Sequence, residues 1–433
     1  MTRLRVATDE TFRSLRSRNF RLFFVGQLVS QAGTWMEMIA VTWVVLQLTD
    51  SGVALGLVAA ARFAPVLLLG PWGGVLSDRL DRHRLMLVTQ ACFAALSTVL
   101  AVLVATGHTT LWLLYGSTLI FGVLTAMDSP SRRALVTELV EPEDIANAVG
   151  LNSALMTGAR TIGPTIAGVM LAGPGASWCF AVNALSYLVI IGNLLRMDRS
   201  LFHTGPVLVK AKGQMRDGFV YVWRNQELLL PLILAAVIGT LAFNYQITLP
   251  LFAERTLDGN AATFTWLYAT MSFGSVCGAL TVARRRDLSV SFLVTAGFAM
   301  TVATVALALA PTTPIALIAA VPLGFTSLML ISGTNAVVQL KADPAMRGRV
   351  LALVSMVFMG STPIGGPIVG WISQQWDARA GLMVGAVATA LATVWTARRL
   401  RQQRPADQPV PDELVDEPVP ADEGVAAAAT AAA

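Results

Sequence analysis

Three charged side chains, Glu37, Arg62 and Arg160, lie inside long apolar stretches of the 433-residue chain. A charged group at the centre of a bilayer costs roughly 2.5–3.5 kcal/mol even on the most lenient scale, so such residues usually have a function. At 1.5 Å per helical residue, Glu37 and Arg62 each lie about 14 Å from the outer end of their stretch, and Arg160 reaches nearly the same level. Two interpretations stay open: a structural ion pair between Glu37 and Arg62 with a spare arginine, or a carboxyl group that takes and releases a proton beside both arginines.

A short charged turn between two apolar stretches contains Gly74, Asp78, Arg79, Arg82 and Arg84. The stretches on both sides are long enough to cross a bilayer, so we expect the turn at the membrane surface. Glycine lets two helices approach closely, and the acid follows about one helical turn later. A plain basic loop would need charge but not this order of charge, which marks the turn as a functional element.

The composition indicates that the solvent of this chain is lipid. Hydrophobic residues make up 55% of it and charged residues only 13%, and the mean hydropathy is +0.63. Soluble domains carry roughly 25% charged residues. Cys92, Cys179 and Cys277 lie in apolar stretches without paired spacing, so we interpret them as core residues. The three histidines are scattered, so we expect no metal site.

About twelve apolar stretches approach the roughly 20 residues that a membrane-spanning helix needs. The sequence therefore predicts an all-α membrane protein. We place the spans at 20–46, 53–76, 85–106, 110–127, 145–171 and 178–195, and then at 228–252, 263–282, 290–310, 314–338, 350–372 and 381–397.

Arginine and lysine residues concentrate in alternate loops between these spans. The other loops contain only Arg255 and Arg379. The positive-inside rule places the basic loops and both termini in the cytoplasm, which agrees with an even number of spans. We therefore expect a multi-pass protein of the plasma membrane. The net charge of +5 is explained by this placement, so we expect no nucleic-acid partner.

The chain divides into five segments by composition. The linker between the two sets of spans contains an amphipathic stretch, Gln214–Trp223, which we expect to lie at the cytoplasmic interface. The last segment is rich in Pro, Asp and Glu and then in Ala, which predicts a disordered tail. The segments are a basic arm (1–19), a six-helix bundle (20–196), the linker (197–227), a second six-helix bundle (228–398) and the tail (399–433).

An internal repeat relates the two halves. When the sequence is shifted by 202 residues, 122–168 aligns with 324–370 without a gap. The match includes Glu141-Pro142 over Asp343-Pro344, which lies in a loop where apolar bias does not produce matches. The fourth and fifth spans thus correspond to the tenth and eleventh, and we expect two pseudo-symmetric bundles.

The charged turn resembles the loop 2–3 signature of the major facilitator superfamily, G-x-L-x-D-R-x-x-R-x-R, although Asp81 replaces its second glycine. The resemblance implies a transporter fold of twelve helices and a gating role for the turn. It also implies that Asp78 faces the start of the eleventh span near Val350 and holds one end shut.

The fifth span resembles the antiporter signature of the same superfamily, G-x8-G-x3-GP-x2-GG. Gly150, Gly163, Pro164 and Gly168 match it, and alanine stands at two glycine positions. The small residues let the fifth and eighth spans approach closely, and the proline introduces a bend. Generic close helix packing is the alternative to an antiporter signature. Four further motifs resemble the branch of the superfamily that contains siderophore and macrolide exporters, which implies export. They are Gln27-Leu-Val-Ser, Gly33-Thr-Trp-Met, Ala60-Ala-Arg-Phe-Ala-Pro65 and Asp128-Ser-Pro-Ser-Arg-Arg133. The polar and aromatic candidates for a central cavity are Gln31, Trp35, Asn244, Tyr245, Gln246 and Asn335.

The resemblance implies a secondary active transporter, a drug:proton antiporter type that exports small amphiphilic molecules by alternating access. We expect a monomer with a small-molecule substrate in the lipid bilayer. The chain has no nucleotide-binding G-x4-G-K-[ST] motif, so we expect no cofactor and the proton gradient as energy source. Glu37 is the first candidate for proton coupling and Asp128 the second. A lipid or lysolipid flippase of the same fold is the alternative function, and a multi-span membrane enzyme is a remote one.

Overall fold

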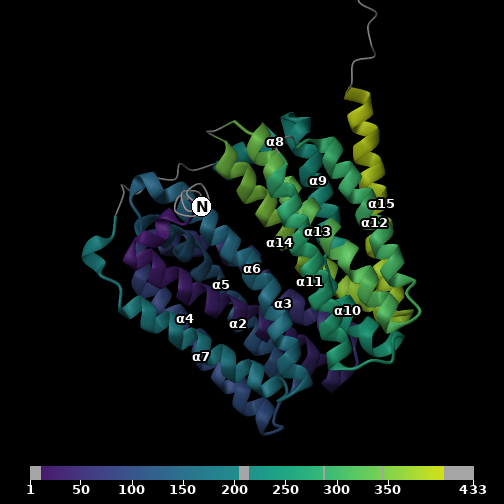
Figure 1. Ribbon diagram of the computed structural model, residues 1–433, viewed down its shortest axis with the longest axis horizontal. Helices are drawn as coiled ribbons and strands as arrows, with labels where there is room; N and C mark the ends of the chain where they lie inside the picture. Colours follow the sequence, from purple (N-terminus) through teal and green to yellow (C-terminus); the bar gives the residue numbers. More distant parts are fainter. Residues whose placement is uncertain (1–10, 204–213, 286–287, 344–345, 404–433) are drawn as a thin grey trace, which may run out of the picture.

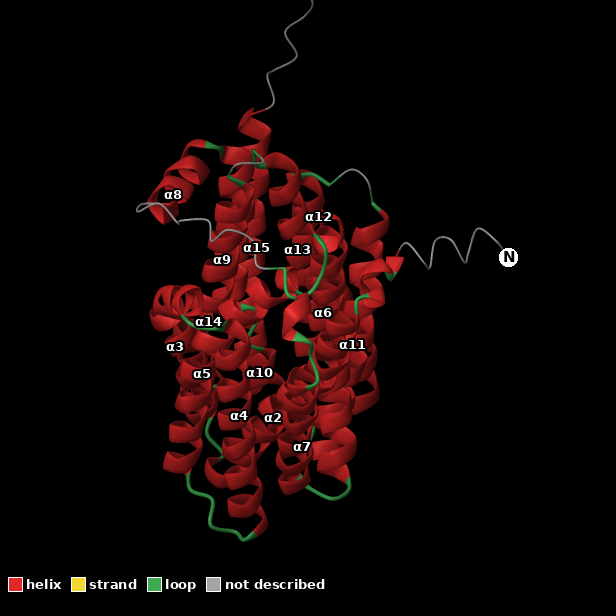
Figure 2. Ribbon diagram, turned by 90° about the vertical axis from the view of Figure 1, so that its left-hand side faces the viewer, coloured by secondary structure: helices red, strands yellow, loops and turns green. Residues whose placement is uncertain are grey.

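The computed structural model describes residues 11–203, 214–285, 288–343 and 346–403, and these contain helices and connections without a β-strand (Figures 1 and 2). The predicted disordered tail beyond residue 403 lies outside the described residues. The long helices are α2 (Arg18–Thr49), α3 (Gly52–Arg79), α4 (Arg82–Ala105), α5 (Leu111–Glu138), α6 (Ile145–Ala172), α7 (Ala176–Leu195), α9 (Gln226–Leu241), α11 (Ala261–Arg284), α12 (Val290–Ala308), α13 (Thr313–Lys341), α14 (Arg347–Gln375) and α15 (Ala378–Gln403). The shorter ones named below are η1 (Arg13–Arg16), α8 (Gln214–Arg224), α10 (Tyr245–Leu251) and η4 (Phe252–Thr256).

Ten helical segments of the described chain are long and apolar enough to cross a membrane. One of them, Gln226–Thr256, consists of α9, α10 and η4 and is interrupted at 242–244. The two long helices outside this set, α2 and α6, have 32 and 28 residues, which at 1.5 Å per residue is enough for a hydrocarbon core of about 30 Å. With them, the number of spans reaches the predicted twelve.

Short polar residues between the spans start the next helix. Ser51, Asp81 and Thr110 are the N-caps of α3, α4 and α5, and each side chain accepts a hydrogen bond from the backbone N–H three residues later. Such caps satisfy donors that have no partner in the first turn of a helix. The replacement of the signature glycine by Asp81 therefore gives the turn a helix cap, and the connection between α3 and α4 stays two residues long.

Equivalent glycines make the same helix–helix contact inside each half. Gly163 of α6 lies against α2, and Gly365 of α14, which is 202 residues later, lies against α9. At both positions a Cβ atom would overlap the neighbouring helix. Since α2 and α9 are the first helices of their halves, the packing has the pseudo-symmetry that the sequence repeat predicts.

Two more glycines join one half to the other along two seams. In the first seam, Gly370 of α14 meets the backbone of Gly52 in α3. In the second, Gly168 of α6, again 202 residues earlier, meets Thr265 of α11. The seams are therefore pseudo-symmetric copies of one contact.

The two bundles converge at one end of the molecule and diverge at the other (Figure 1). They meet at the lower right of the figure, near α10, and separate toward α8 and the N-terminal end. We call the convergent end, with the connections 50–51, 252–260 and 376–377, the closed end. The opposite end, with α8 and the connection between α3 and α4, is the basic end.

Helix α8 rests on the second bundle at the basic end. Asp217 lies 3.7 Å from the Arg349 guanidinium at the start of α14, and the Tyr221 hydroxyl donates a 2.9 Å hydrogen bond to Asp343. The rings of Phe219 and Trp223 stack at 5.9 Å and stay exposed. This arrangement of one packed and one exposed apolar face is typical of a helix at a membrane interface.

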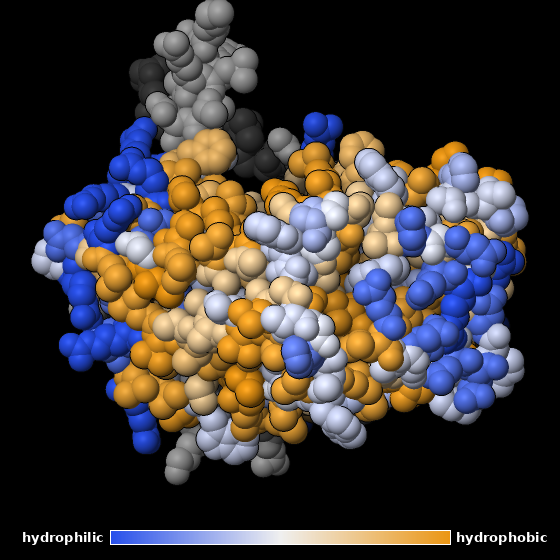
Figure 3. Space-filling view, turned by 90° about the horizontal axis from the view of Figure 1, so that it is seen from below, coloured by the Kyte–Doolittle hydropathy of each residue, from blue (hydrophilic) through white to orange (hydrophobic). Residues whose placement is uncertain are grey.

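The outer surface between the two ends is mostly apolar. In Figure 3, hydrophobic side chains predominate between hydrophilic groups gathered at the left and right edges of the view. Cys92 is exposed, so the expectation that it is a core residue is wrong, whereas Cys179 is buried. In a chain solvated by lipid, an apolar residue needs no core, which explains the difference.

Candidate substrate cavity and charged network

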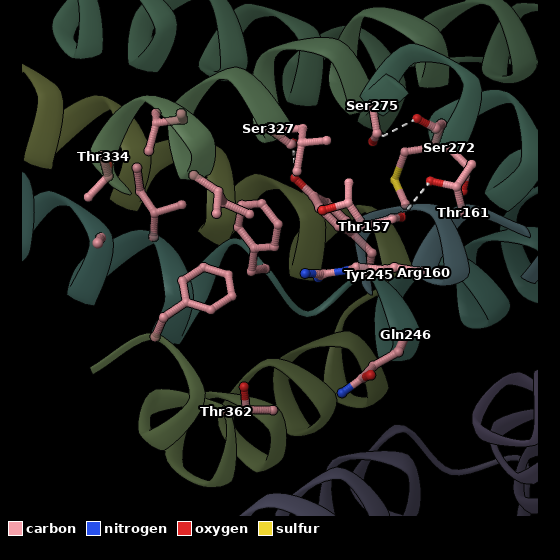
Figure 4. Close-up of a pocket in the computed structure, with 18 of the residues that line it drawn as sticks. Thr157, Arg160, Thr161, Tyr245, Gln246, Ser272, Ser275, Ser327, Thr334 and Thr362 are labelled. Carbon is pink, nitrogen blue, oxygen red and sulfur yellow. Dashed lines mark hydrogen bonds between the residues drawn. The ribbon is translucent and has the colours of Figure 1, made fainter. Parts of the chain in front are cut away.

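A cavity of about 330 Å³ lies between the two halves. Helices α2, α3 and α6 of the first half and α9, α10, α11, α13 and α14 of the second contribute to its walls. Its volume is within the roughly 300–1,000 Å³ that small-molecule sites usually have. Figure 4 shows several of its polar side chains, with Arg160 and Tyr245 next to each other in the view.

Four of the six predicted cavity residues line this cavity: Trp35, Tyr245, Gln246 and Asn335. Gln31 and Asn244 do not, which corrects the prediction for both. Gln31 is buried and contacts the side chain of Gln27 one turn earlier in α2. Asn244 donates a 2.7 Å hydrogen bond to the Thr240 carbonyl across the break between α9 and α10. Its side chain therefore provides a partner for a backbone carbonyl near the end of α9.

Several residues of the cavity wall were not among the predicted ones. Tyr268, Ser272 and Ser275 of α11 face it together, as do Phe243 and Phe358, whose rings lie edge to face at 5.2 Å. The three α11 residues follow each other at intervals of four and three, which is the spacing of one helix face. That polar stripe in an otherwise apolar helix is the signal that would have found them.

Backbone contacts seal the closed end along the first seam. A Cβ atom on Gly56 would lie 2.6 Å from the Gly366 carbonyl oxygen and 2.7 Å from the Pro367 Cα. Gly52 and Gly370 meet one helical turn further out. Each helix thus contributes a small-xxx-small pair, a spacing that lets two helices approach backbone to backbone.

Polar contacts between the halves lie just beyond this seam. The Arg255 guanidinium binds the Asp50 carboxylate at 3.0 Å. Gln374 accepts hydrogen bonds from the Ser51 hydroxyl at 2.7 Å and from the Val53 N–H at 3.1 Å. Arg255, one of the two arginines outside the basic loops, therefore joins the halves at the closed end.

Glu37 lies in the interior of the first bundle and not in the cavity wall. Its carboxylate accepts hydrogen bonds from the Ser97 hydroxyl of α4 and, at 2.5 Å, from the Asn183 amide of α7. Arg62 is near enough for electrostatic attraction, but no N–O distance of 4.0 Å or less joins the two among the described residues. The direct ion pair, one of the two interpretations that the sequence left open, is therefore not formed, because neutral donors from α4 and α7 occupy the carboxylate.

Arg62 connects this buried network to the cavity. Its guanidinium lies 4.0 Å above the Phe121 ring. Together with Gln246 of the opposite half it lines a small cavity of about 10 Å³, roughly the volume that a single water molecule needs. Gln246 also lines the central cavity, so the two cavities share this residue.

Arg160 lines the central cavity and does not belong to the group around Glu37, which corrects the interpretation that both arginines lie beside that carboxyl group. It lies 5.1 Å from the centre of the Trp35 ring. The titratable groups close to it are the phenols of Tyr245 and Tyr268. No carboxylate of the described residues forms an ion pair with it.

Asp128 is buried near the basic end of the first bundle. It accepts 2.9 Å hydrogen bonds from the side chains of Thr89 and Gln90, and Arg132 lies 3.6 Å away. These four groups make a buried polar cluster, which Ser30 of α2 joins by a hydrogen bond to Gln90. Asp128 is therefore a buried carboxylate that neighbours already satisfy, as Glu37 is.

The charged turn is tied to the first bundle by ion pairs. Arg82 pairs with Glu138 at the end of α5, and Asp81 pairs with Arg199 and, at 3.6 Å, with Arg84. Partial burial acts to raise the pKa of Asp81, but hydrogen bonds from the Arg84 N–H and the Arg199 guanidinium hold that pKa below its ordinary value. Ion pairs thus attach the turn to the end of α5 through Glu138 and to the segment after α7 through Arg199.

One member of the resembled motifs is placed differently from the prediction, since Gly150 has open space around it. Gly73, the neighbour of Gly74, makes a close approach of α3 to α5. Arg79 is exposed at the end of α3. The Asp78 side chain lies outside the described residues, so its predicted contact with α14 stays a prediction. Pro164 is buried inside α6.

Two pseudo-symmetric bundles of six spanning helices around a central cavity define a transporter of the major facilitator type. The fold agrees with solved structures of such transporters. The structure of a POT family transporter in complex with 5-aminolevulinic acid superimposes with a TM-score of 0.73, covering 89% of this chain and 96% of that one at 10% identity. An inward-facing and occupied bacterial homologue of the human lysosomal transporter Spinster gives 0.69, covering 89% and 97% at 14% identity.

Sequence similarity assigns the chain to a particular family of these transporters. The model of the family described as transmembrane secretion effector matches residues 9–428, so the chain belongs to that family. It is 27% identical to the multidrug efflux pump Tap of Mycobacterium bovis over 92% of this chain and 97% of that protein. It is 25% identical to the staphyloferrin A transporter of Staphylococcus aureus over 60% of this chain, and spans 66%, just under two thirds, of that relative. Macrolide efflux protein A of Streptococcus pyogenes is 21% identical over 80% and 87%.

Proposed function

We propose that this chain is a proton-coupled exporter of small amphiphilic molecules that works by alternating access. The observation that carries the proposal is the central cavity, which is sealed by the seams at the closed end and lies between bundles that separate toward the basic end. The efflux proteins among the relatives support export. With the basic end in the cytoplasm, the structure corresponds to the state that receives substrate from inside the cell.

Glu37 is the proposed proton carrier. It is 1% exposed and interacts electrostatically with Arg62, which lines a small cavity together with Gln246, a residue of the substrate cavity. Protonation of Glu37 would remove its attraction to Arg62, so the position of Arg62 next to the opposite half would depend on the proton. One proton moving down 100 mV supplies about 2.3 kcal/mol, enough for a substrate gradient of more than tenfold.

The test uses the full chain in proteoliposomes with a pH gradient as the only energy source. The panel contains siderophores, macrolides, hydrophobic cations and a fluorescent lysolipid, and internal pH is followed at the same time. Accumulation of a small molecule coupled to proton movement is the expected result. Movement of the lysolipid alone would instead establish the flippase, and movement of substrate without protons would overturn the coupling.

The variant Glu37→Gln separates the carrier from a structural role. The amide keeps the shape and can still accept the Ser97 hydrogen bond, so we expect a monodisperse protein that binds substrate but no longer concentrates it. Asp128→Asn is the matched control, because that carboxylate is also buried and hydrogen-bonded. If Glu37→Gln still concentrates substrate and Asp128→Asn does not, Asp128 and not Glu37 is the proton carrier.

A further inference from the structure

The cavity has an unbalanced charge. Among the described residues that line it, Arg160 is the one charged side chain, and the wall contains no aspartate or glutamate. Arg62, a buried arginine of α3, lies near the carboxylate of Glu37. Arg160, which is exposed, instead has the Trp35 ring and the phenols of Tyr245 and Tyr268 nearby and no carboxylate among the described residues. A guanidinium carries five N–H donors and no acceptor, so neutral tyrosines cannot balance its charge.

The rest of the wall separates into polar and apolar parts. Hydroxyl groups of Thr157, Thr161 and Ser272 lie on the helices around Arg160 (Figure 4). Phe243 and Phe358 form an aromatic wall contributed by the second half. A ligand that satisfies both parts has a charged head and a flat apolar body.

We infer that the cavity binds amphiphiles that carry an anionic group such as a carboxylate, and that Arg160 is the residue that binds this group. A planar carboxylate accepts two parallel hydrogen bonds from one guanidinium, which is stronger than a hydrogen bond between neutral groups. A basic amphiphile of the same shape would bring a second cation to Arg160 without an acid to accept it. This inference rests on the proposed function, since it names the substrate class of the same cavity.

The test measures binding to the purified full chain without any gradient, by calorimetry with three probes of one shape. The probes are naphthylacetate, naphthylethanol and naphthylethylamine, which are anionic, neutral and cationic at pH 7. We expect naphthylacetate to bind about tenfold or more tightly than naphthylethanol, the effect of a charge-assisted hydrogen bond, and naphthylethylamine to bind most weakly.

Three variants assign the preference to one residue. Arg160→Gln should lower the affinity for naphthylacetate to that for naphthylethanol and leave naphthylethanol unchanged, while Arg160→Lys should restore part of the preference. Arg398→Gln, at the exposed end of α15, should leave all three affinities unchanged. Gel filtration of each variant checks that it is folded.

Two results would overturn the inference. One is a wild-type protein that binds naphthylethylamine as tightly as naphthylacetate, and the other is an Arg160→Gln protein that weakens all three probes equally. Because the assay needs no transport, its outcome is separate from the proposed function. An anion preference without transport in proteoliposomes would refute the exporter alone, whereas transport without the preference would refute the anion site alone.

Discussion

The first seam gives a prediction whose size follows from the contact between Gly56 and Gly366. In Gly56→Ala the new methyl group would lie 2.6 Å from the Gly366 carbonyl oxygen and 2.7 Å from the Pro367 Cα, both of which are backbone atoms. No side chain can move aside, so the two helices must separate. We expect Gly56→Ala to favour the state in which the closed end is open.

The matched control lies in the same helix. Gly70 of α3 has no atom within 4 Å of an added Cβ, so Gly70→Ala brings only the gain in helix propensity, about 0.8–1.0 kcal/mol. Gly56→Ala brings the same gain and an overpacking cost of about 1–3 kcal/mol. The difference between the two variants should therefore shift the equilibrium between closed and open states by about 5- to 150-fold.

The equilibrium can be followed by the distance between two spin labels at the closed end. His108, between α4 and α5, and Thr312, before α13, are exposed there on opposite halves. Both are changed to cysteine after the natural residues Cys92, Cys179 and Cys277 have been replaced by serine. A longer distance should become populated in Gly56→Ala and not in Gly70→Ala. Identical distance distributions in the two variants would refute the backbone seal.

Two further predictions concern ion pairs at opposite ends. Asp50→Asn and Arg255→Gln should each loosen the closed end, with a coupling of about 0.2–1 kcal/mol in a double-mutant cycle read from the same spin labels, since the pair is partly exposed. A coupling of zero would mean that the ion pair does not stabilise the closed end. At the basic end, the pKa of Asp81 is depressed, so its pairing with Arg199 stabilises the fold above the ordinary pKa of 3.8 and is lost as the pH falls through the lower folded value. The unfolding temperature of Arg199→Ala should lie below the wild-type value at pH 6 and converge with it at acidic pH, and a constant difference at all pH values would contradict this.

The helices were predictable because a span must satisfy its backbone hydrogen bonds internally and needs a minimum apolar length. The repeat gave the correspondence of α5 and α6 with α13 and α14 for a similar reason, since equivalent spans need equivalent close packing. Gly163 and Gly365 are the clearest case: the shift of 202 residues aligns them, and both pack against the first helix of their half.

The site was less predictable because residue counting gives the depth of a side chain and not its direction around the helix axis. Glu37 and Arg62 were paired by depth, yet Ser97 and Asn183 reach the carboxylate. Arg160 does not belong to the network around Glu37, because its side chain lines the central cavity. The direction of a side chain is set by which helices pack together.

Of the contacts between the two halves, the close packing of the fifth and eighth spans was expected, and it is found where Gly168 of α6 meets Thr265 of α11. The polar contacts between the halves could not be inferred. The pairing of Arg255 with Asp50 joins residues 205 positions apart, and it depends on how the whole bundles are placed. The sequence showed only that Arg255 was an exception to the charge pattern of the loops.

The glycine seams also decide how much conformational freedom is lost when the closed end forms. Packing a Leu or Ile side chain into a contact costs about 0.5–1 kcal/mol in lost rotamers, whereas glycine has no rotamers to lose. Where Gly52 meets Gly370 and Gly56 meets Gly366, the two surfaces are already rigid before they touch. The first seam therefore forms and separates with almost no loss of side-chain entropy, and the side chains that lose freedom when the closed end forms are those of the polar contacts beyond it, such as Arg255 and Gln374.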